Sequence, residues 1–164
     1  MKVKNLEYAR GDWIVHLYHG VGQIVGVEKK YLEGETVSYF KVKTKDCTFW
    51  VPVKQVDNVR IRRIASRQEI QEVLNILKRN PRQMSHDHTE RKSRINRVKE
   101  DGTLAAIARI VRDLTARQKQ SRLNDSEERA LNRFTDRLLS EWAACFGIKL
   151  EEARKRLRTI LQKL

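Results

Sequence analysis

The sequence has no long apolar segment. Among its 164 residues, no uninterrupted apolar run approaches the ~20 residues that a membrane-spanning helix needs. The N-terminal segment carries lysines but lacks the apolar stretch of a secretory signal peptide, so we expect a cytoplasmic protein. Glycine and proline are scarce as well, with 7 and 2 residues, which excludes a linker or a fibrous protein. Because hydrophobic residues still make up 40% of the chain, we expect folded globular domains.

Residue patterns that carry catalytic or metal chemistry are also missing. The two cysteines, Cys47 and Cys145, lie far apart and outside any CxxC motif, so we expect reduced thiols and neither a disulfide nor a zinc site. The sequence contains no glycine-rich phosphate loop and no GxSxG or HExxH motif. The cluster His86-Asp87-His88 does not suit a metal on a helix, because residues i and i+2 point apart there. We therefore expect no enzyme, no metal and no cofactor.

Positive charge is what the chain has in excess. Lysine and arginine number 35 against 21 aspartates and glutamates, for a formal charge of +14. Such a surplus favours a polyanionic partner, usually nucleic acid and less often an anionic lipid or an acidic protein face. The 22 residues from Lys78 to Lys99 hold 8 basic and 2 acidic side chains, whereas residues 1–65 hold 12 and 7. Because the basic stretch does not alternate charge sign as a solvated helix usually does, it favours phosphate contact.

The spacing of apolar residues changes near residue 65. Before it, short runs rich in valine, isoleucine and aromatic residues are separated by glycine-containing turns, which is typical of strands. The predicted strands are Trp13–His16, Gly22–Lys30, Val37–Lys43, Thr48–Val51 and Val59–Ile64, with tight turns at His19-Gly20, Glu33-Gly34 and Lys45-Asp46. Five short strands at this spacing predict a small β-barrel of the SH3 or Tudor type.

After Ala65 the apolar residues recur at helical spacing. Five helices are predicted. The first runs over 66–79 behind a capping box at Ser66, and the second over about 87–99. The third begins at Thr103, the fourth runs from the cap cluster at 124–128 to Gly147, and the fifth begins near Leu150. We therefore predict an α+β chain of two domains. The first is a barrel over 1–65 with helix 66–79 docked on it, because a barrel of this size has a small core. The second is an all-α bundle over 80–164.

Both domains offer candidate binding residues. In the basic helix, Arg91, Lys92, Arg94, Arg97 and Lys99 are the candidates for contact with phosphates, and because they cannot share one face we expect about half of them to touch DNA. In the barrel, the candidates at an exposed strand edge are Lys30, Tyr31, Phe49 and Trp50. Alternation along Thr48–Val51 predicts that Phe49 and Trp50 face opposite sides, so one of them is exposed. An open edge of this kind suits the addition of a strand from a partner protein.

Four sequence blocks carry a family resemblance. They are GDWIVHLYHGVGQI at 11–24, Trp50-Val51-Pro52, IARIVRDL at 107–114 after Asp101-Gly102, and 123–131 with Ser126-Glu127-Glu128-Arg129. Together they resemble the CarD/CdnL family of bacterial transcription regulators over nearly the whole chain. The barrel block alone would also fit the polymerase-binding module of transcription-repair coupling factors, but the helical half would not.

The resemblance implies a non-catalytic protein with two partners. Its barrel would pair an edge strand with the β-subunit lobe of RNA polymerase, and Lys30 and Trp50 fall where family members carry polymerase-contacting, commonly basic, residues. Its helical domain would lie on double-stranded promoter DNA at the upstream edge of the bubble and alter open-complex stability. Family members begin the basic helix with a tryptophan that wedges into the minor groove. That position falls on His88, which joins the DNA-binding candidates. We expect a monomer; the alternative is an RNA- or ribosome-binding protein.

Overall fold

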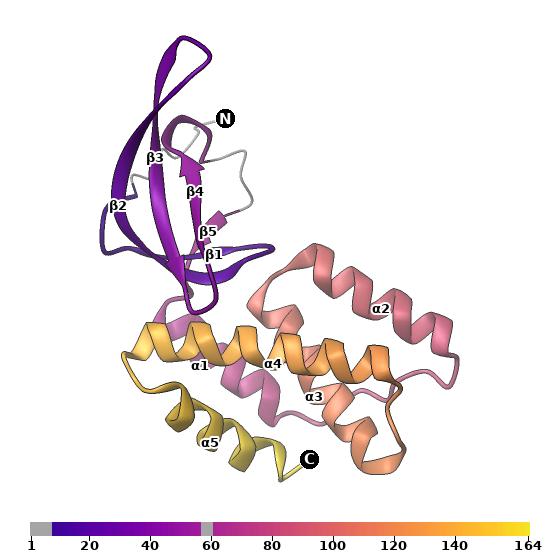
Figure 1. Ribbon diagram of the computed structural model, residues 1–164. Coiled ribbons are helices and arrows are strands. Elements are labelled where there is room, and N and C mark those ends of the chain that lie inside the picture. Colours follow the sequence, from indigo (N-terminus) through magenta and orange to yellow (C-terminus); the bar gives the residue numbers. More distant parts are fainter. Residues whose placement is uncertain (1–7, 57–60) are drawn as a thin grey trace, which may run out of the picture. The chain divides into compact units, whose positions relative to one another are not determined.

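The chain divides into two compact units, each with one class of secondary structure (Figure 1). The computed structural model describes residues 8–56 and 61–164. The barrel unit ends at Ile64 and the helical unit begins at Ala65. Within the described ranges, all strands belong to the first unit and all α-helices to the second. The predicted α+β organisation, with strands first and helices after them, is confirmed.

The barrel unit is one antiparallel sheet. Its strands are β1 (Trp13–His16), β2 (Gly20–Leu32), β3 (Glu35–Thr44), β4 (Thr48–Pro52) and β5 (Ile61–Arg63), and a short 3-10 turn, η1 (Val53–Gln55), follows β4. The strand order is β4-β3-β2-β1-β5, and the long, bent β2 pairs with both β1 and β3 (Figure 1). Four predicted strands are confirmed, β1 with the predicted bounds and β2, β3 and β4 with slightly longer ones. The fifth, predicted over 59–64, begins at residues outside the described ranges, and its described part forms β5.

A two-residue turn sets the register of the β2–β3 hairpin. Leu32 pairs with Glu35, so Glu33 and Gly34 alone make the turn. Both have a positive φ, of 50° and 88°, which matches the twist of a tight hairpin and is a conformation that glycine adopts without steric cost. The register directs one face of the sheet into a small apolar core. This core contains Tyr8, Ile14, Ile24, Phe40, Val42, Val51 and Val56.

The helical unit contains five helices, α1 (Arg67–Lys78), α2 (His88–Asp101), α3 (Leu104–Gln120), α4 (Asp125–Phe146) and α5 (Leu150–Leu161). The predicted caps are present: the Ser66 hydroxyl accepts from the Glu69 amide, the Thr103 hydroxyl caps α3, and Gly147 ends α4 with a φ of 64°. None of the helices in the described ranges has the length and apolar content that crossing a bilayer requires.

Helix α1 packs in the helical unit. Sequence reasoning placed this helix on the barrel and began the second domain at residue 80. In the structure its buried side chains, Ile70, Val73, Ile76 and Leu77, belong to the core that α3, α4 and α5 also build. The physical reason is that an amphipathic stripe packs well on the matching stripe of another helix, and Pro81 ends α1 without ending the domain. Met84, beyond that proline, is buried in the same core.

Candidate functional site

An exposed tryptophan occupies the outer face of the barrel sheet. Trp50 on β4 is 39% exposed, which confirms the alternation predicted for this strand. Its indole N–H donates a hydrogen bond of 2.7 Å to Oε2 of Glu28 on β2. The Nζ of Lys30, also on β2, lies 3.9 Å from the centre of the indole ring, within the range of a cation–π contact. The structure thus brings together two of the four predicted barrel residues.

Glu28 organises this cluster, because its second oxygen accepts a hydrogen bond of 2.9 Å from Nζ of Lys41 on β3. The hydrogen bonds from Lys41 and Trp50 lower the pKa of the Glu28 carboxyl below its ordinary value. Glu28 is therefore ionised near neutral pH and holds the indole edge at a fixed angle. We call Glu28, Lys30, Lys41 and Trp50 the Trp50 platform.

Phe49 and Tyr31, the other two predicted barrel residues, lie outside the Trp50 platform. Phe49 points to the opposite face of β4, where its ring packs against the barrel core and stacks on His19 at a centroid distance of 4.6 Å. Tyr31 follows Lys30 on β2, so its side chain leaves the sheet on the other side, and it is 75% exposed. The alternation predicted that one of these two aromatic residues is exposed, and in the structure it is Trp50, with Phe49 on the core side.

The platform lies beside a free sheet edge. In the order formed by the described strands, β4 stands at one end and pairs only with β3. An end strand presents backbone N–H and C=O groups that an incoming strand can pair with. The edge and the fixed indole together make a surface that can add a strand and anchor it with one large side chain.

In the helical unit, Arg91 of α2 is buried. Its guanidinium pairs with the buried carboxylate of Glu127 at the start of α4, and Nη1 donates to the carbonyl oxygens of Ser85 and His86 at 2.9 and 2.8 Å. Glu127 also completes the capping box of α4 with Asn124. This one ion pair therefore holds α2, the segment before it and the first turn of α4 together.

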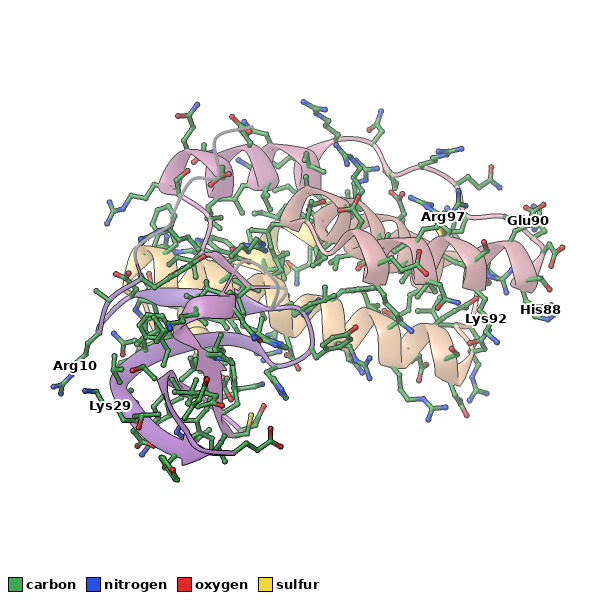
Figure 2. The ribbon with its side chains drawn as sticks, turned by 90° about the horizontal axis from the view of Figure 1, so that it is seen from above. Arg10, Lys29, His88, Glu90, Lys92 and Arg97 are labelled. Atoms are coloured by element: carbon green, nitrogen blue, oxygen red, sulfur yellow. The ribbon has the colours of Figure 1, made fainter. Side chains whose placement is uncertain are left out.

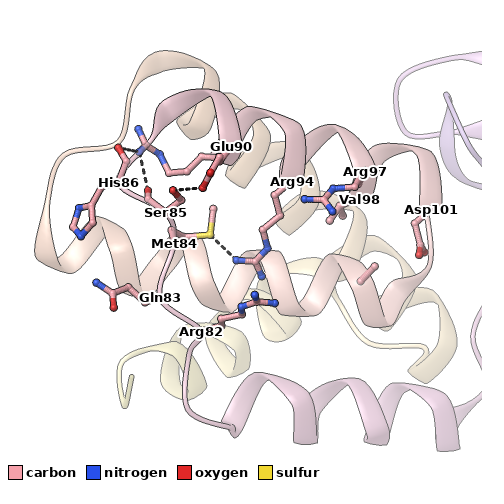
Figure 3. Close-up of a pocket in the computed structure, with 12 residues that line it drawn as sticks. Arg82, Gln83, Met84, Ser85, His86, Glu90, Arg94, Arg97, Val98 and Asp101 are labelled. Atoms are coloured by element: carbon pink, nitrogen blue, oxygen red, sulfur yellow. Dashed lines mark hydrogen bonds between the residues drawn. The ribbon is translucent and has the colours of Figure 1, made fainter.

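Arg94 makes a second ion pair of the same kind. Its Nη2 contacts the fully buried carboxylate of Asp113 on α3, and the other oxygen of Asp113 accepts from Nε of Arg112 at 2.8 Å. The backbone N–H of Arg82 donates to that same oxygen at 2.9 Å. The Arg94 guanidinium also lies against Sδ of Met84 (Figure 3). These contacts fix the rotation of α2 about its axis.

The two arginines thus take a different place from the one that the sequence suggests. We placed Arg91 and Arg94 among the candidates for contact with DNA, but the structure buries the first and half-buries the second. The helix has few apolar residues, so ion pairs supply the packing that aliphatic side chains supply elsewhere. The signal that could have revealed this is Asp113, an acid inside the apolar spacing of α3, because a buried carboxylate needs a cationic partner.

The remaining basic residues of α2 divide between two sides of the helix. His88, Lys92 and Lys99 follow each other at spacings of four and seven, so they share one side, which we call the lysine flank. Arg97 projects on the other side with Glu90, as Figure 2 shows. Lys92, Lys99 and Arg97 are exposed, and the side chain of His88 is 78% exposed. On the lysine flank itself α2 places no carboxylate, since Glu90 and Asp101 lie on the Arg97 side and Glu100 lies between the two sides.

The His86-Asp87-His88 cluster serves the helix start. Asp87 is the N-cap of α2, and its Oδ1 accepts from the Thr89 amide at 2.7 Å. His88 is the first residue of α2. Across the described part of the chain, no group of three or more histidine, cysteine, aspartate or glutamate residues is arranged to hold a metal ion.

A β-barrel with an exposed, hydrogen-bonded indole followed by a basic helical bundle defines a class of two-domain proteins. Family comparisons give that class a name. The model of the CarD C-terminal domain matches residues 72–158, and the model of the CarD-like/TRCF RID domain matches residues 8–65. The chain belongs to the CarD-like family of non-enzymatic transcription regulators, and this membership indicates interaction with RNA polymerase.

A curated relative agrees with this assignment. The chain is 26% identical over 147 residues to YdeB of Bacillus subtilis (strain 168), a protein provisionally named a transcription factor. The match covers 84% of this chain and 92% of the relative, so the likeness includes both units.

Proposed function

We propose that this protein binds the β subunit of RNA polymerase through the Trp50 platform and the β4 edge, and promoter DNA through the lysine flank of α2. Held on both partners, it changes the stability of the open complex. A regulator of this kind works in the bacterial cytoplasm, without a cofactor.

The fixed orientation of Trp50 carries the polymerase half of the proposal. Large aromatic side chains are frequent anchors of protein interfaces, but an exposed indole normally loses rotamer freedom on binding. Here Glu28 and Lys30 already hold the ring from its edge and its face. Preorganisation of this kind favours association, because less conformational entropy is lost.

The locked rotation of α2 supports the DNA half. The buried pairs of Arg91 with Glu127 and Arg94 with Asp113 leave Lys92 and Lys99 on one exposed flank. Lysines at this spacing can reach successive phosphates along a backbone, which gives affinity without sequence preference. His88 stands at the end of the same flank, at the position that the family resemblance assigns to the wedge residue.

Binding of the full-length chain to an isolated β-lobe fragment of RNA polymerase tests the proposal. We expect Trp50→Ala to weaken this binding by about 30-fold, the effect of removing one interface anchor. Tyr31→Ala is the matched control, because it deletes an even more exposed aromatic side chain from the same sheet outside the platform. We expect it to leave the affinity within a factor of about two.

Absence of binding at low salt would overturn the proposal, and so would equal losses in Trp50→Ala and Tyr31→Ala. If the chain instead bound a structured RNA tightly and ignored the β lobe, the alternative of an RNA- or ribosome-binding protein would replace it.

A further inference from the structure

The helical unit contains a cleft on the side of α2 that faces away from the lysine flank. Its volume is about 730 Å³, and its walls are the 82–86 segment, α2 and the beginning of α3 (Figure 3). A volume of this size is typical of small-molecule sites, which span roughly 300–1,000 Å³. The cleft takes no part in the function proposed above.

Three guanidinium groups converge in the middle of this cleft. Figure 3 shows Arg82, Arg94 and Arg97 directed toward the same space from the 82–86 segment and from α2. The carboxylate behind them, Asp113, already shares its single charge between Arg94 and Arg112. The middle of the cleft therefore has a surplus of positive charge.

The two carboxylates in the lining lie at the ends of the cleft and have local partners. Glu90 accepts a hydrogen bond from the Ser85 hydroxyl. Asp101 accepts from the amide and the hydroxyl of Thr103, and these hydrogen bonds lower the pKa of its carboxyl. Both acids are thus held by residues close to them in the sequence, whereas Arg82 and Arg97 are exposed (Figure 3). Like charges brought together in this way are stabilised by an anion placed between them.

Part of the remaining lining is apolar. Met84, Val98 and Ala106 contribute carbon surface beside the arginines. Guanidinium groups recognise phosphate oxygens by paired hydrogen bonds, and an apolar wall accepts the organic part of an ester. We propose that this arginine cleft binds a phosphate ester, through Arg82 and Arg97 with Arg94 behind them.

Two sources can supply a phosphate ester, a free nucleotide and the backbone of DNA. The two are separable, because the arginine cleft and the lysine flank lie on different sides of α2. The experiment therefore begins with a free probe, ATP, titrated calorimetrically into the full-length chain at low salt. We expect wild-type protein to bind ATP with a Kd of about 1 mM or tighter.

The variant Arg82→Gln/Arg97→Gln should weaken ATP binding by at least about tenfold, since it removes two charge-assisted donors. The control Lys92→Gln/Lys99→Gln removes the same total charge from the lysine flank and should keep the wild-type Kd. Circular dichroism checks that both variants remain folded, which their exposed positions favour. No ATP binding by wild-type protein would overturn the proposal, as would equal weakening in the two variants.

Adding duplex DNA to the ATP-bound protein tests which of the two sources of phosphate ester the arginine cleft binds. Displacement of ATP by DNA would support the arginine cleft as a site for the nucleic-acid backbone. Simultaneous binding of DNA and ATP would support it as a site for a free phosphorylated molecule. Because ATP binding is measured without polymerase or promoter, its failure would leave the proposed function standing, and the reverse also holds.

Discussion

The barrel unit and the helical unit use the same kind of ion pair in opposite surroundings. In the barrel, Glu28 pairs with Lys41 on the surface, where the two side chains are 38% and 39% exposed. In the helical unit, Glu127 pairs with Arg91 at 3% and 8% exposure. The exposed pair orients a neighbouring indole, whereas the buried pair holds a helix in place. Burial therefore decides whether an ion pair arranges a binding surface or supports the fold beneath one.

The free-energy cost of losing the ion pair also differs strongly between the two units. An exposed pair is screened by water and salt, so its loss affects the fold little. A buried pair that loses one partner leaves an uncompensated charge in a region of low dielectric constant. Breaking each ion pair in turn should therefore lower the stability of the helical unit but hardly that of the barrel unit.

The largest expected effect is that of Glu127→Ala. It leaves Arg91 buried without its carboxylate and removes the reciprocal cap at Asn124, so we expect the free energy of unfolding to fall by about 3–5 kcal/mol. Urea denaturation followed by circular dichroism at the helical minimum measures this loss. Glu28→Ala, the corresponding change in the barrel, should leave the helical transition unchanged. Equal urea midpoints of unfolding for the two variants would contradict the distinction between an exposed and a buried ion pair.

The second effect concerns the lysine flank. In Lys92→Glu/Lys99→Glu, DNA affinity should fall for all sequences, and the plot of log affinity against log salt should become shallower by about 0.9 per lost phosphate contact. Fluorescence anisotropy with a labelled duplex measures both quantities. The reversal Lys155→Glu/Lys163→Glu, on α5 and just after its end, makes the same charge change at two exposed lysines elsewhere in the unit. If the α5 variant flattened the slope as much, α2 would not be the anchor.

The smallest effect is expected at the start of α2. If His88 occupies the wedge position, His88→Trp adds an aromatic surface that stacks on bases, worth ~1 kcal/mol or about fivefold in open-complex lifetime. His86→Trp places the same side chain two residues earlier, before the helix begins, and should have no such effect. An unchanged or shorter lifetime for His88→Trp would count against this alignment.

Local signals in the sequence predict most of the fold. Caps such as Ser66 and Thr103 and the stop at Gly147 act within one helical turn, so these residues indicate the helix ends in the sequence itself. The core that an amphipathic helix joins depends on distant partners instead. The sequence therefore predicts the existence of α1 and its buried face, but its place in the helical unit emerges only from the fold.

In the candidate sites, too, local sequence signals predict some features, and others depend on distant parts of the fold. Alternation alone predicts that one of Phe49 and Trp50 faces out. The contact of Trp50 with Glu28 depends on strand register, which a bulge at Ile24–Gly26 shifts. Counting charges finds the basic stretch but cannot distinguish a buried arginine from an exposed one. Arg91 and Lys92 are adjacent in sequence, yet the first packs on Glu127 and the second faces solvent.

The lifetime of a promoter open complex, measured with and without this protein, tests the central claim that both units act together. We predict that wild-type protein changes this lifetime, and that Trp50→Ala and Lys92→Glu/Lys99→Glu each return it to the value without protein. A lifetime that wild-type protein leaves unchanged, or a change that survives in both variants, would contradict the account.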